Sequence, residues 1–283
     1  MSTTQIEKFW QELVADIQAN RVVLPSLPDV ALKVRKLLDT PSTPAARIAA
    51  AISADAVLTT RLLRMVNSPL YRTSHTIDNV QAAVTRLGNS NVRNLVTSLA
   101  MEQLYQARVS TDQKKRMLAR HREHGMMVAA LSWFIARNYT VLNAEESMLA
   151  GLIHDIGKLP IIEYAELAPD IASDEGALER LIEILHPRVG VLMLRSWSFP
   201  KDLAAAVAEH ENLDRDPGTP ADHTDVVIVA NLLSYIGTDH PHTRRDWSSI
   251  PAFRRLAITP EESIDAMKNA KEQIHEVRLL LAA

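Results

Sequence analysis

Apolar residues recur three or four positions apart through most of this sequence, which is the spacing of one face of a helix. The first such segment, from about residue 4 to residue 20, carries Ile6, Phe9, Trp10, Leu13, Val14 and Ile17. No segment shows the alternation of apolar and polar residues that marks a half-buried strand. Only 8 glycines and 5% aromatic residues among 283 also favour helix over sheet. We therefore predict an all-α chain.

Signals for helix ends lie close together along the chain. Asp55 and Thr259 are suited to cap the first turn of a helix, and Gly88 is suited to end one. Many short helices joined by short loops predict a compact multi-helix array rather than a bundle of long rods.

The helical pattern predicts two packed helical lobes. The apolar period lapses between about Gln106 and Asp112. We expect an N-terminal amphipathic helix over residues 1–23, an N-terminal helical lobe over 24–110, and a second lobe with a C-terminal helix over 111–283. That last helix has Ile264, Met267, Ile274, Val277 and Leu281 at near-helical spacing. The first and last helices are the predicted docking surfaces for a partner.

Composition excludes several classes of protein. A formal net charge of -3 gives no overall attraction to nucleic acid or anionic lipid. The absence of cysteine excludes disulfides, thiolate metal sites and cysteine nucleophiles, and it fits a reducing cytoplasm. The N-terminus has no signal-peptide pattern, and no apolar stretch reaches the roughly 20 residues that span a bilayer. We therefore expect a cytoplasmic location without membrane insertion.

The doublet His154-Asp155 is the strongest chemical signal in the sequence. Side by side, an imidazole nitrogen and a carboxylate oxygen could both reach one divalent metal, such as Mn, Fe, Mg or Zn. Three further histidines lie on or beside helical patterns, namely His124, His186 and His210. At the place where a closing carboxylate would be expected, the sequence has Asn231.

This arrangement resembles the HD superfamily of metal-dependent phosphohydrolases, whose signature is a histidine, a His-Asp doublet and a distal aspartate. The matching residues here are His124, His154-Asp155 and Asn231. From about Leu24 to about Ser234 the sequence is more similar still to the HDOD family, the HD-related output domain of bacterial signalling proteins.

The N-terminal part carries the most specific portion of that resemblance. The order and spacing typical of HDOD proteins are followed by Leu24-Pro25-Ser26-Leu27-Pro28, Asp55-Ala56-Val57-Leu58-Thr59, Leu62-Leu63-Arg64-Met65-Val66-Asn67-Ser68 and Ala82-Ala83-Val84-Thr85-Arg86-Leu87-Gly88. The family usually has Asp-Pro where this chain has Asp55-Ala56. This departure affects only the predicted start of one helix. The resemblance implies a regulatory module whose metal site has decayed.

Asn231 in place of the distal acid predicts a degenerate metal site. An ion held by neutral imidazoles and the single carboxylate of Asp155 keeps uncompensated positive charge, and an amide does not accept a proton from activated water. His186 and His210 match positions that help to hold a second ion in two-metal relatives, but we expect no bridging carboxylate. Without metal, Asp155 could accept hydrogen bonds from the histidines, and Lys158 could counter its charge.

We therefore expect a bacterial signal-transduction output or scaffold module that acts by binding, with no cofactor and no catalytic residue. Its partner would be a sensor kinase, a response regulator or a nucleotide-signalling enzyme, and a small-molecule ligand is an open alternative. No receiver or sensor domain precedes the module, so its input is expected from another chain or a small ligand, unless the sequence is a fragment.

The alternative is an active metal-dependent phosphohydrolase acting on a nucleotide or other phosphoester. Its metal would be held by His124, His154 and Asp155, with Asn231 as a weak fourth ligand, and Asp155 and Lys158 would serve catalysis. Nucleic-acid binding by the basic helical stretch of Lys114-Lys115-Arg116, Arg120 and Arg122 is a distant third interpretation.

Overall fold

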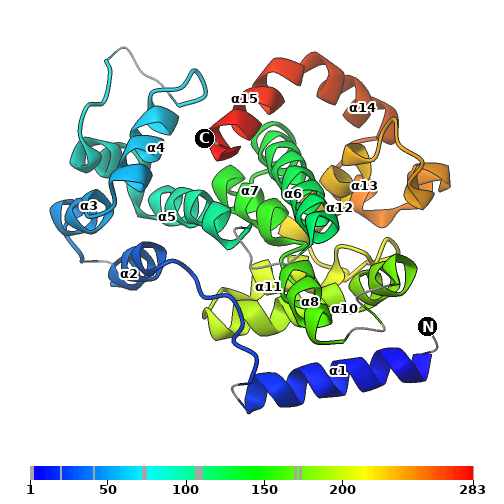
Figure 1. The fold of residues 1–283 in the computed structure, drawn as a ribbon. Helices are drawn as coiled ribbons and strands as arrows, with labels where there is room; N and C mark the ends of the chain where they lie inside the picture. Colours follow the sequence, from blue (N-terminus) through cyan, green and yellow to red (C-terminus); the bar gives the residue numbers. More distant parts are fainter. Residues whose placement is uncertain are drawn as a thin grey trace.

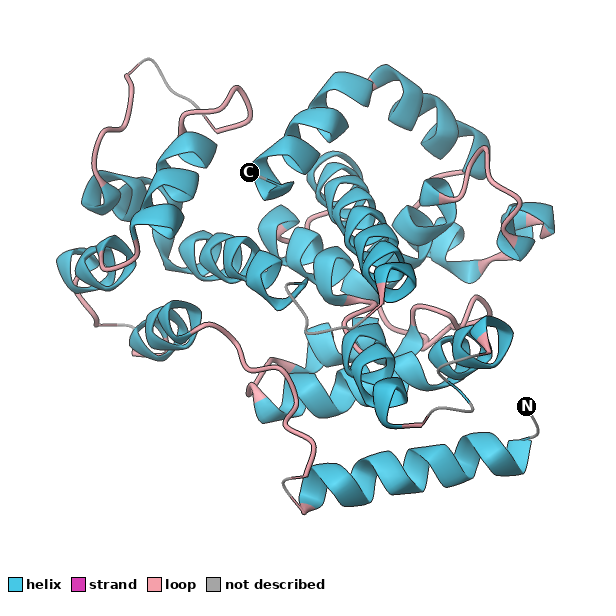
Figure 2. Ribbon diagram, in the orientation of Figure 1, coloured by secondary structure: helices cyan, strands magenta, loops and turns pink. Residues whose placement is uncertain are grey.

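The computed structural model describes residues 3–19, 21–40, 42–71, 75–105, 111–168, 171 and 174–282. Within these ranges helices are the regular structure and no strand is present (Figures 1 and 2). The prediction of an all-α fold is confirmed.

One group of helices lies before residue 110 and is coloured blue to cyan-green in Figure 1. It comprises α2 (Asp29–Leu38), α3 (Ala45–Ser53), α4 (Ala56–Val66), α5 (Val80–Met101) and the short η1 (Glu102–Tyr105). The helices α2, α3 and α4 all pack against α5, whose buried side chains include Leu95 and Leu99. The long helix α5 is therefore the centre of this group.

The other helices surround α6 (Asp112–Tyr139), the long helix near the middle of Figure 1. They are α7 (Ala144–Ile153), α8 (Lys158–Tyr164), η2 (Ala165–Leu167), α10 (Glu175–Ser196), α11 (Lys201–Glu209), α12 (His223–Ser234), η3 (Pro241–Arg244), η4 (Trp247–Ser249), α13 (Pro251–Arg255), α14 (Pro260–Asn269) and α15 (Lys271–Ala282). The helices α7, α12 and α15 pack on α6, while α8 and α11 pack on α10. Because α5 also packs on α7, one apolar core runs through both groups.

The predicted lobe boundary near residues 106–112 falls largely on residues 106–110, which lie outside the described residues. The division into residues 1–23, 24–110 and 111–283 stays a prediction.

Predicted signals for helix ends are found where the sequence places them. The Asp55 carboxylate accepts a hydrogen bond of 2.8 Å from the backbone N–H of Leu58 and so caps α4. Thr259 and Glu262 form a reciprocal capping box at the start of α14. Gly88 has a φ of 76° and interrupts the helical backbone of α5.

The first helix, α1 (Thr3–Gln18), lies below α8 and α10 in Figure 1. Phe9 is buried, and its ring contacts the Tyr164 ring edge-on at 5.3 Å between centroids. The guanidinium of Arg188 lies 4.1 Å from the centre of the Trp10 ring. The apolar stripe of this helix is therefore used inside the molecule.

The last helix, α15, is docked in the same manner. Ile274, Val277, Leu280 and Leu281 are buried. The buried Arg61 of α4 donates a hydrogen bond of 2.5 Å to the Leu281 carbonyl. The apolar stripes of the first and last helices are therefore buried inside the molecule, because an amphipathic pattern predicts burial without saying against what. Docking of a partner on these helices stays a prediction.

No described helix combines the length and the apolar character needed to cross a membrane.

Candidate metal centre

His154 and Asp155 lie in the turn between α7 and α8, and two glycines allow this turn to approach its neighbours. A Cβ on Gly157 would overlap the backbone of His186 and Gly190 in α10. A Cβ on Gly151 would likewise collide with α6. The sequence Gly-Leu-Ile-His-Asp-Ile-Gly therefore brings the doublet between α6 and α10, where histidines from both helices can reach it.

The carboxylate of Asp155 lies between two pairs of histidines. Its Oδ2 atom is 3.4 Å from His154 Nε2 and 3.7 Å from His124 Nε2. Its Oδ1 atom is 3.3 Å from His186 Nε2 and 3.5 Å from His210 Nε2. The structure thus brings together the four histidines that the sequence analysis singled out, His124, His154, His186 and His210. The expectation that no carboxylate would bridge the two halves is wrong, because Asp155 faces both.

In three of the histidines, the ring nitrogen that faces away from Asp155, Nδ1, is hydrogen-bonded to a backbone carbonyl. His154 Nδ1 is 2.6 Å from the Gly151 carbonyl, His186 Nδ1 is 2.7 Å from that of Ile182, and His210 Nδ1 is 3.0 Å from that of Val207. A carbonyl oxygen only accepts, so each Nδ1 carries a proton, and in the neutral ring the lone pair is on Nε2. This is how proteins orient metal-binding histidines.

The Nε2 atoms face one another at close range. His124 and His154 are 3.3 Å apart at Nε2, and His186 and His210 are 3.1 Å apart. Two lone pairs at such distances repel unless a proton or a cation lies between them. The metal-free centre therefore needs at least one proton, and a bound cation would take over its role.

The residues present fit a divalent metal. Both oxygens of Asp155 are buried and make no aligned hydrogen bond to a described residue. Two sets of three ligand atoms lie close enough to hold an ion: His124, His154 and Asp155 form one set, and Asp155, His186 and His210 form the other. When bound, such an ion supplies Lewis acidity and positive charge.

Lys158 lies at the Oδ2 side of the Asp155 carboxylate, with Nζ 2.5 Å from that atom. Burial alone would raise the pKa of Asp155, but its contacts with His154 and Lys158 hold it well below its usual value. Lys158 thus counters the charge of Asp155, one of the two roles that the sequence left open.

The histidines of the centre differ in how readily they take up a proton. Burial lowers the pKa of His124 to about 3 and that of His186 to about 4. Burial acts on His210 in the same direction, but its close contacts with the carboxylates of Asp155 and Glu211 outweigh it and raise its pKa to about 9. Without metal, His210 therefore carries the proton at neutral pH.

Glu211 is a second carboxylate at the edge of the centre, and sequence reasoning missed it. Its Oε1 atom lies 3.5 Å from His210 Nε2, and its Oε2 atom lies 3.2 Å from His242 Nε2. Burial opposes ionisation of Glu211, but its hydrogen bonds to His210 and His242 move its pKa below the usual range. The negative charge of Glu211 therefore lies beside His210, in the half of the centre that contains His186 and His210.

Asn231 is buried in α12, and its Oδ1 atom makes no hydrogen bond to a described residue. Burial raises the pKa of the neighbouring Tyr235, the charge of Asp155 adds to this, and a hydrogen bond with Asn231 opposes it. Asn231 therefore lies beside a tyrosine whose pKa is raised by the charge of Asp155. Its role as a weak fourth ligand stays a prediction.

Aromatic rings cover the centre on the side of His124. The Tyr235 ring stacks on His124 at 5.3 Å between centroids and on His240 at 3.6 Å. His121, one turn before His124, is also largely buried near Lys158, and burial lowers its pKa to about 3. The sequence signal for this cover was the pair His240 and His242 soon after α12.

Comparison with known proteins identifies the family. The family model of the HDOD domain matches residues 24–213, which is more than half of the chain. This chain belongs to the HDOD family.

Similar solved structures share this HDOD fold. A protein of Shewanella amazonensis SB2B, provisionally named as a metal-dependent phosphohydrolase, aligns with a TM-score of 0.81 and 24% identity over 99% of this chain and 100% of its own. An HDOD domain protein of unknown function from Geobacter sulfurreducens aligns with a TM-score of 0.69 and 21% identity over 95% and 96% of the two chains.

A sequence relative extends beyond this HDOD chain. An uncharacterized protein of Treponema pallidum (strain Nichols) is 24% identical over 260 residues, covering 88% of this chain and 50% of the relative. The chain thus spans about half the length of that relative.

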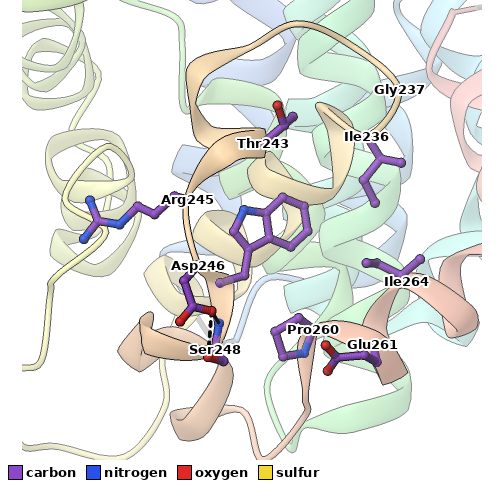
Figure 3. A pocket seen from close by; sticks show the side chains of 10 residues that line it. Ile236, Gly237, Thr243, Arg245, Asp246, Ser248, Pro260, Glu261 and Ile264 are labelled. Carbon is purple, nitrogen blue, oxygen red and sulfur yellow. Dashed lines mark hydrogen bonds between the residues drawn. The ribbon is translucent and has the colours of Figure 1, made fainter.

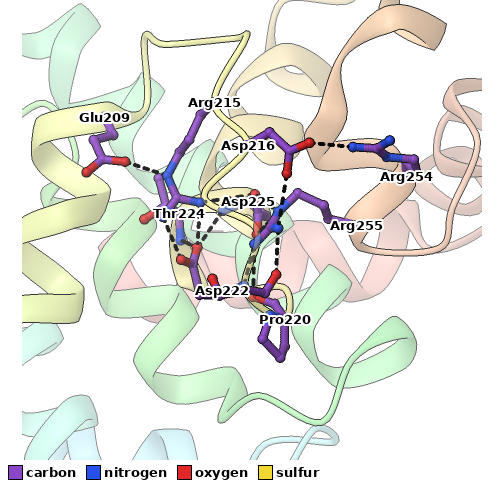
Figure 4. Close-up of polar contacts among 10 residues, drawn as sticks. Glu209, Arg215, Asp216, Pro220, Asp222, Thr224, Asp225, Arg254 and Arg255 are labelled. Carbon is purple, nitrogen blue, oxygen red and sulfur yellow. Dashed lines mark hydrogen bonds and ion pairs between the residues drawn. The ribbon is translucent and has the colours of Figure 1, made fainter.

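A buried ion network fixes the loop between His210 and α12 (Figure 4). Asp225 is fully buried, with Arg215 Nη1 at 3.3 Å and Arg255 Nε at 3.0 Å from its carboxylate. Arg215 also pairs with Asp222 at 2.6 Å. Because each buried charge has an opposite partner, the network holds the ends of α11 and α12 in a fixed relation, and with them His210 and Asn231.

The predicted basic segment at the start of α6 is partly internal. Lys114 is buried and pairs with Glu166 at 2.7 Å. Lys115 pairs with Asp112 in its own helix at 3.2 Å. Lys114 is therefore turned away from any phosphate backbone, which weakens the nucleic-acid interpretation.

Proposed function

We propose that this HDOD chain is a signal-transduction module that acts by binding, and that its buried His–Asp centre holds a divalent metal as a fixed part of the fold. The observation that carries the proposal is Asp155: Lys158 pairs with its Oδ2 atom, yet each of its two buried oxygens also faces a pair of histidine Nε2 atoms without an aligned hydrogen bond. A charge buried in this way is normally paired or bound to metal.

The charges favour the half of the centre that contains His186 and His210. There the carboxylates of Asp155 and Glu211 together balance the charge of a divalent ion. On the other half Lys158 already pairs with Oδ2, and Asn231 supplies no charge. We therefore propose that the ion binds first beside His186 and His210, with His124 and His154 as a weaker second half.

Enclosure favours binding over turnover. His154 and His210 are fully buried, and Asp155 and His186 are 2% and 1% exposed. On the side of His124, the Tyr235 ring stacks between His124 and His240. A phosphoester would need an opening for its phosphorus to reach this buried centre, whereas a fixed metal that ties the turn between α7 and α8 to α10 and α11 needs none.

Partners are proposed on the same basis. A module that ties helices together through a metal serves well as a rigid scaffold, and we propose a sensor kinase, a response regulator or a nucleotide-signalling enzyme as its partner. A solved structure with the same fold, from Marinobacter aquaeolei VT8, is provisionally named as a signal transduction protein; it has a TM-score of 0.58 at 19% identity, and 60% of it is covered.

The test combines elemental analysis with an activity panel. Protein purified without chelator should contain about one equivalent of Mn, Fe, Mg or Zn, and should not hydrolyse nucleotides or model phosphoesters with any of these ions added. The alternative enzyme would show turnover that disappears in His154→Ala, and that result would overturn the binding function. A metal-free protein with unchanged thermal stability would overturn the metal centre.

A further inference from the structure

A cavity of about 470 Å³ lies between the segment that follows α12 and the start of α14 (Figure 3). Its apolar wall is formed by Ile236, Trp247, Pro260 and Ile264. The cavity is separate from the His–Asp centre, and its volume is in the range of small-molecule sites in proteins. Nothing in the proposed function uses it.

The Trp247 ring is held in place from two directions. Its indole N–H donates a hydrogen bond of 2.8 Å to the His242 carbonyl. Phe253 stacks nearly parallel to it, with 6.0 Å between centroids. The ring is therefore an immobile aromatic surface at the cavity, and its polar atom is already satisfied.

The charges at the cavity leave one carboxylate free. Arg245 extends away from Ile236 and Ile264 in Figure 3 and pairs with Asp214. Asp246 accepts hydrogen bonds from the backbone and hydroxyl of Ser248. Glu261 is exposed, and among the described residues it has no recorded hydrogen bond or ion pair. The site therefore combines an aromatic face with a carboxylate that has no ion-pair partner among the described residues.

We propose that this cavity binds a small organic cation, such as a substituted ammonium ion. The apolar part of the ligand would lie between Ile236 and Ile264, and its positive charge would lie near the Trp247 ring and the Glu261 carboxylate. Aromatic rings attract cations through their negative faces, and a nearby carboxylate adds to this attraction. An anion would meet the opposite field.

Benzyltrimethylammonium is a suitable probe, because it joins an aromatic ring to a permanent positive charge. We expect saturable binding by calorimetry with a dissociation constant on the order of 1 mM, as for other small ligands of this size. The neutral analogue 2-phenylethanol should bind about fivefold more weakly or worse.

Three variants test the location. Glu261→Gln should weaken binding of the probe about threefold, and Ile236→Trp should abolish it by filling the cavity while leaving the fold intact by circular dichroism. Glu272→Gln, an exposed acid at the start of α15, is the matched control and should bind normally. The proposal is overturned if the probe does not bind, if 2-phenylethanol binds equally well, or if Ile236→Trp binds as tightly as the wild type.

Discussion

The Oδ1 atom of Asp155 lies 3.3 Å from Nε2 of His186, although the two residues belong to different helical segments. This contact makes Asp155 the carboxylate shared by both halves of the centre, since its other oxygen faces His154. The His154-Asp155 doublet and His124 therefore form one half of the centre. The other half, with His186 and His210, determines which charges surround an ion bound there.

Metal binding at alkaline pH should release a proton. The pKa of His210 is raised to about 9, so at pH 8 most of the metal-free protein carries a proton on this ring, and a metal ligand must lose it. Calorimetric titration of Zn²⁺ at pH 8 in buffers with different ionisation enthalpies should show close to one proton released, and about none in His210→Ala. Equal release by wild type and variant would contradict the role of His210.

The metal-free protein should lose stability as the pH falls below about 6.5. Burial lowers the pKa of His124 to about 3 and that of His186 to about 4, so the unfolded chain takes up these protons first. Each should cost on the order of 2 kcal/mol at pH 5. His210, whose pKa is raised, reaches its full contribution only below about 6.5 and so offsets a small part of this loss. Urea unfolding of chelator-treated protein at pH 7 and pH 5 measures this difference, and equal midpoints would refute it.

Gly157→Ala should destabilise the fold strongly. Its new Cβ would overlap the backbone of His186 and Gly190, which cannot move aside as a flexible side chain can. We expect a loss of about 3 kcal/mol or more in the free energy of unfolding, together with loss of bound metal. Gly176→Ala is the matched control, because its Cβ would meet only Asp174 Oδ1 at 3.6 Å. If both variants unfold at the same urea concentration, the close approach is not a structural requirement.

Phe9→Ala should release the first helix from the body of the protein. Phe9 is 3% exposed and packs against Tyr164, so its truncation should cost about 3 to 5 kcal/mol in local or global stability. Lys8→Ala, on the exposed side of the same helix, should cost less than about 0.5 kcal/mol. Hydrogen exchange of residues 5–17 reports the outcome, and unchanged protection in Phe9→Ala would show that the helix is held by other contacts.

Helical periodicity was sufficient to predict the fold class and several helix ends, because burial of an apolar stripe and capping are local properties. Asp55 and Gly88 act as their residue types indicate. Periodicity could not predict where α1 docks, since its stripe would fit any apolar surface. The position of this helix beside Tyr164 is a tertiary result.

The candidate site was found in part. The doublet and the three other histidines are visible in the sequence because imidazole and carboxylate are recognisable ligand types. Glu211 and Tyr235 were missed, because nothing in their local sequence shows that folding brings them to the doublet. The bridging position of Asp155 was missed for the same reason: spacing along the chain does not say which helices its two oxygens will face.

The central claim is that Asp155 is the shared ligand of a metal centre, and metal content measured by elemental analysis tests it most directly. Wild-type protein should retain about one divalent ion after gel filtration, Asp155→Asn should retain almost none while staying folded, and Asn231→Asp should retain at least as much as wild type. A folded Asp155→Asn protein with the full wild-type metal content would contradict the account.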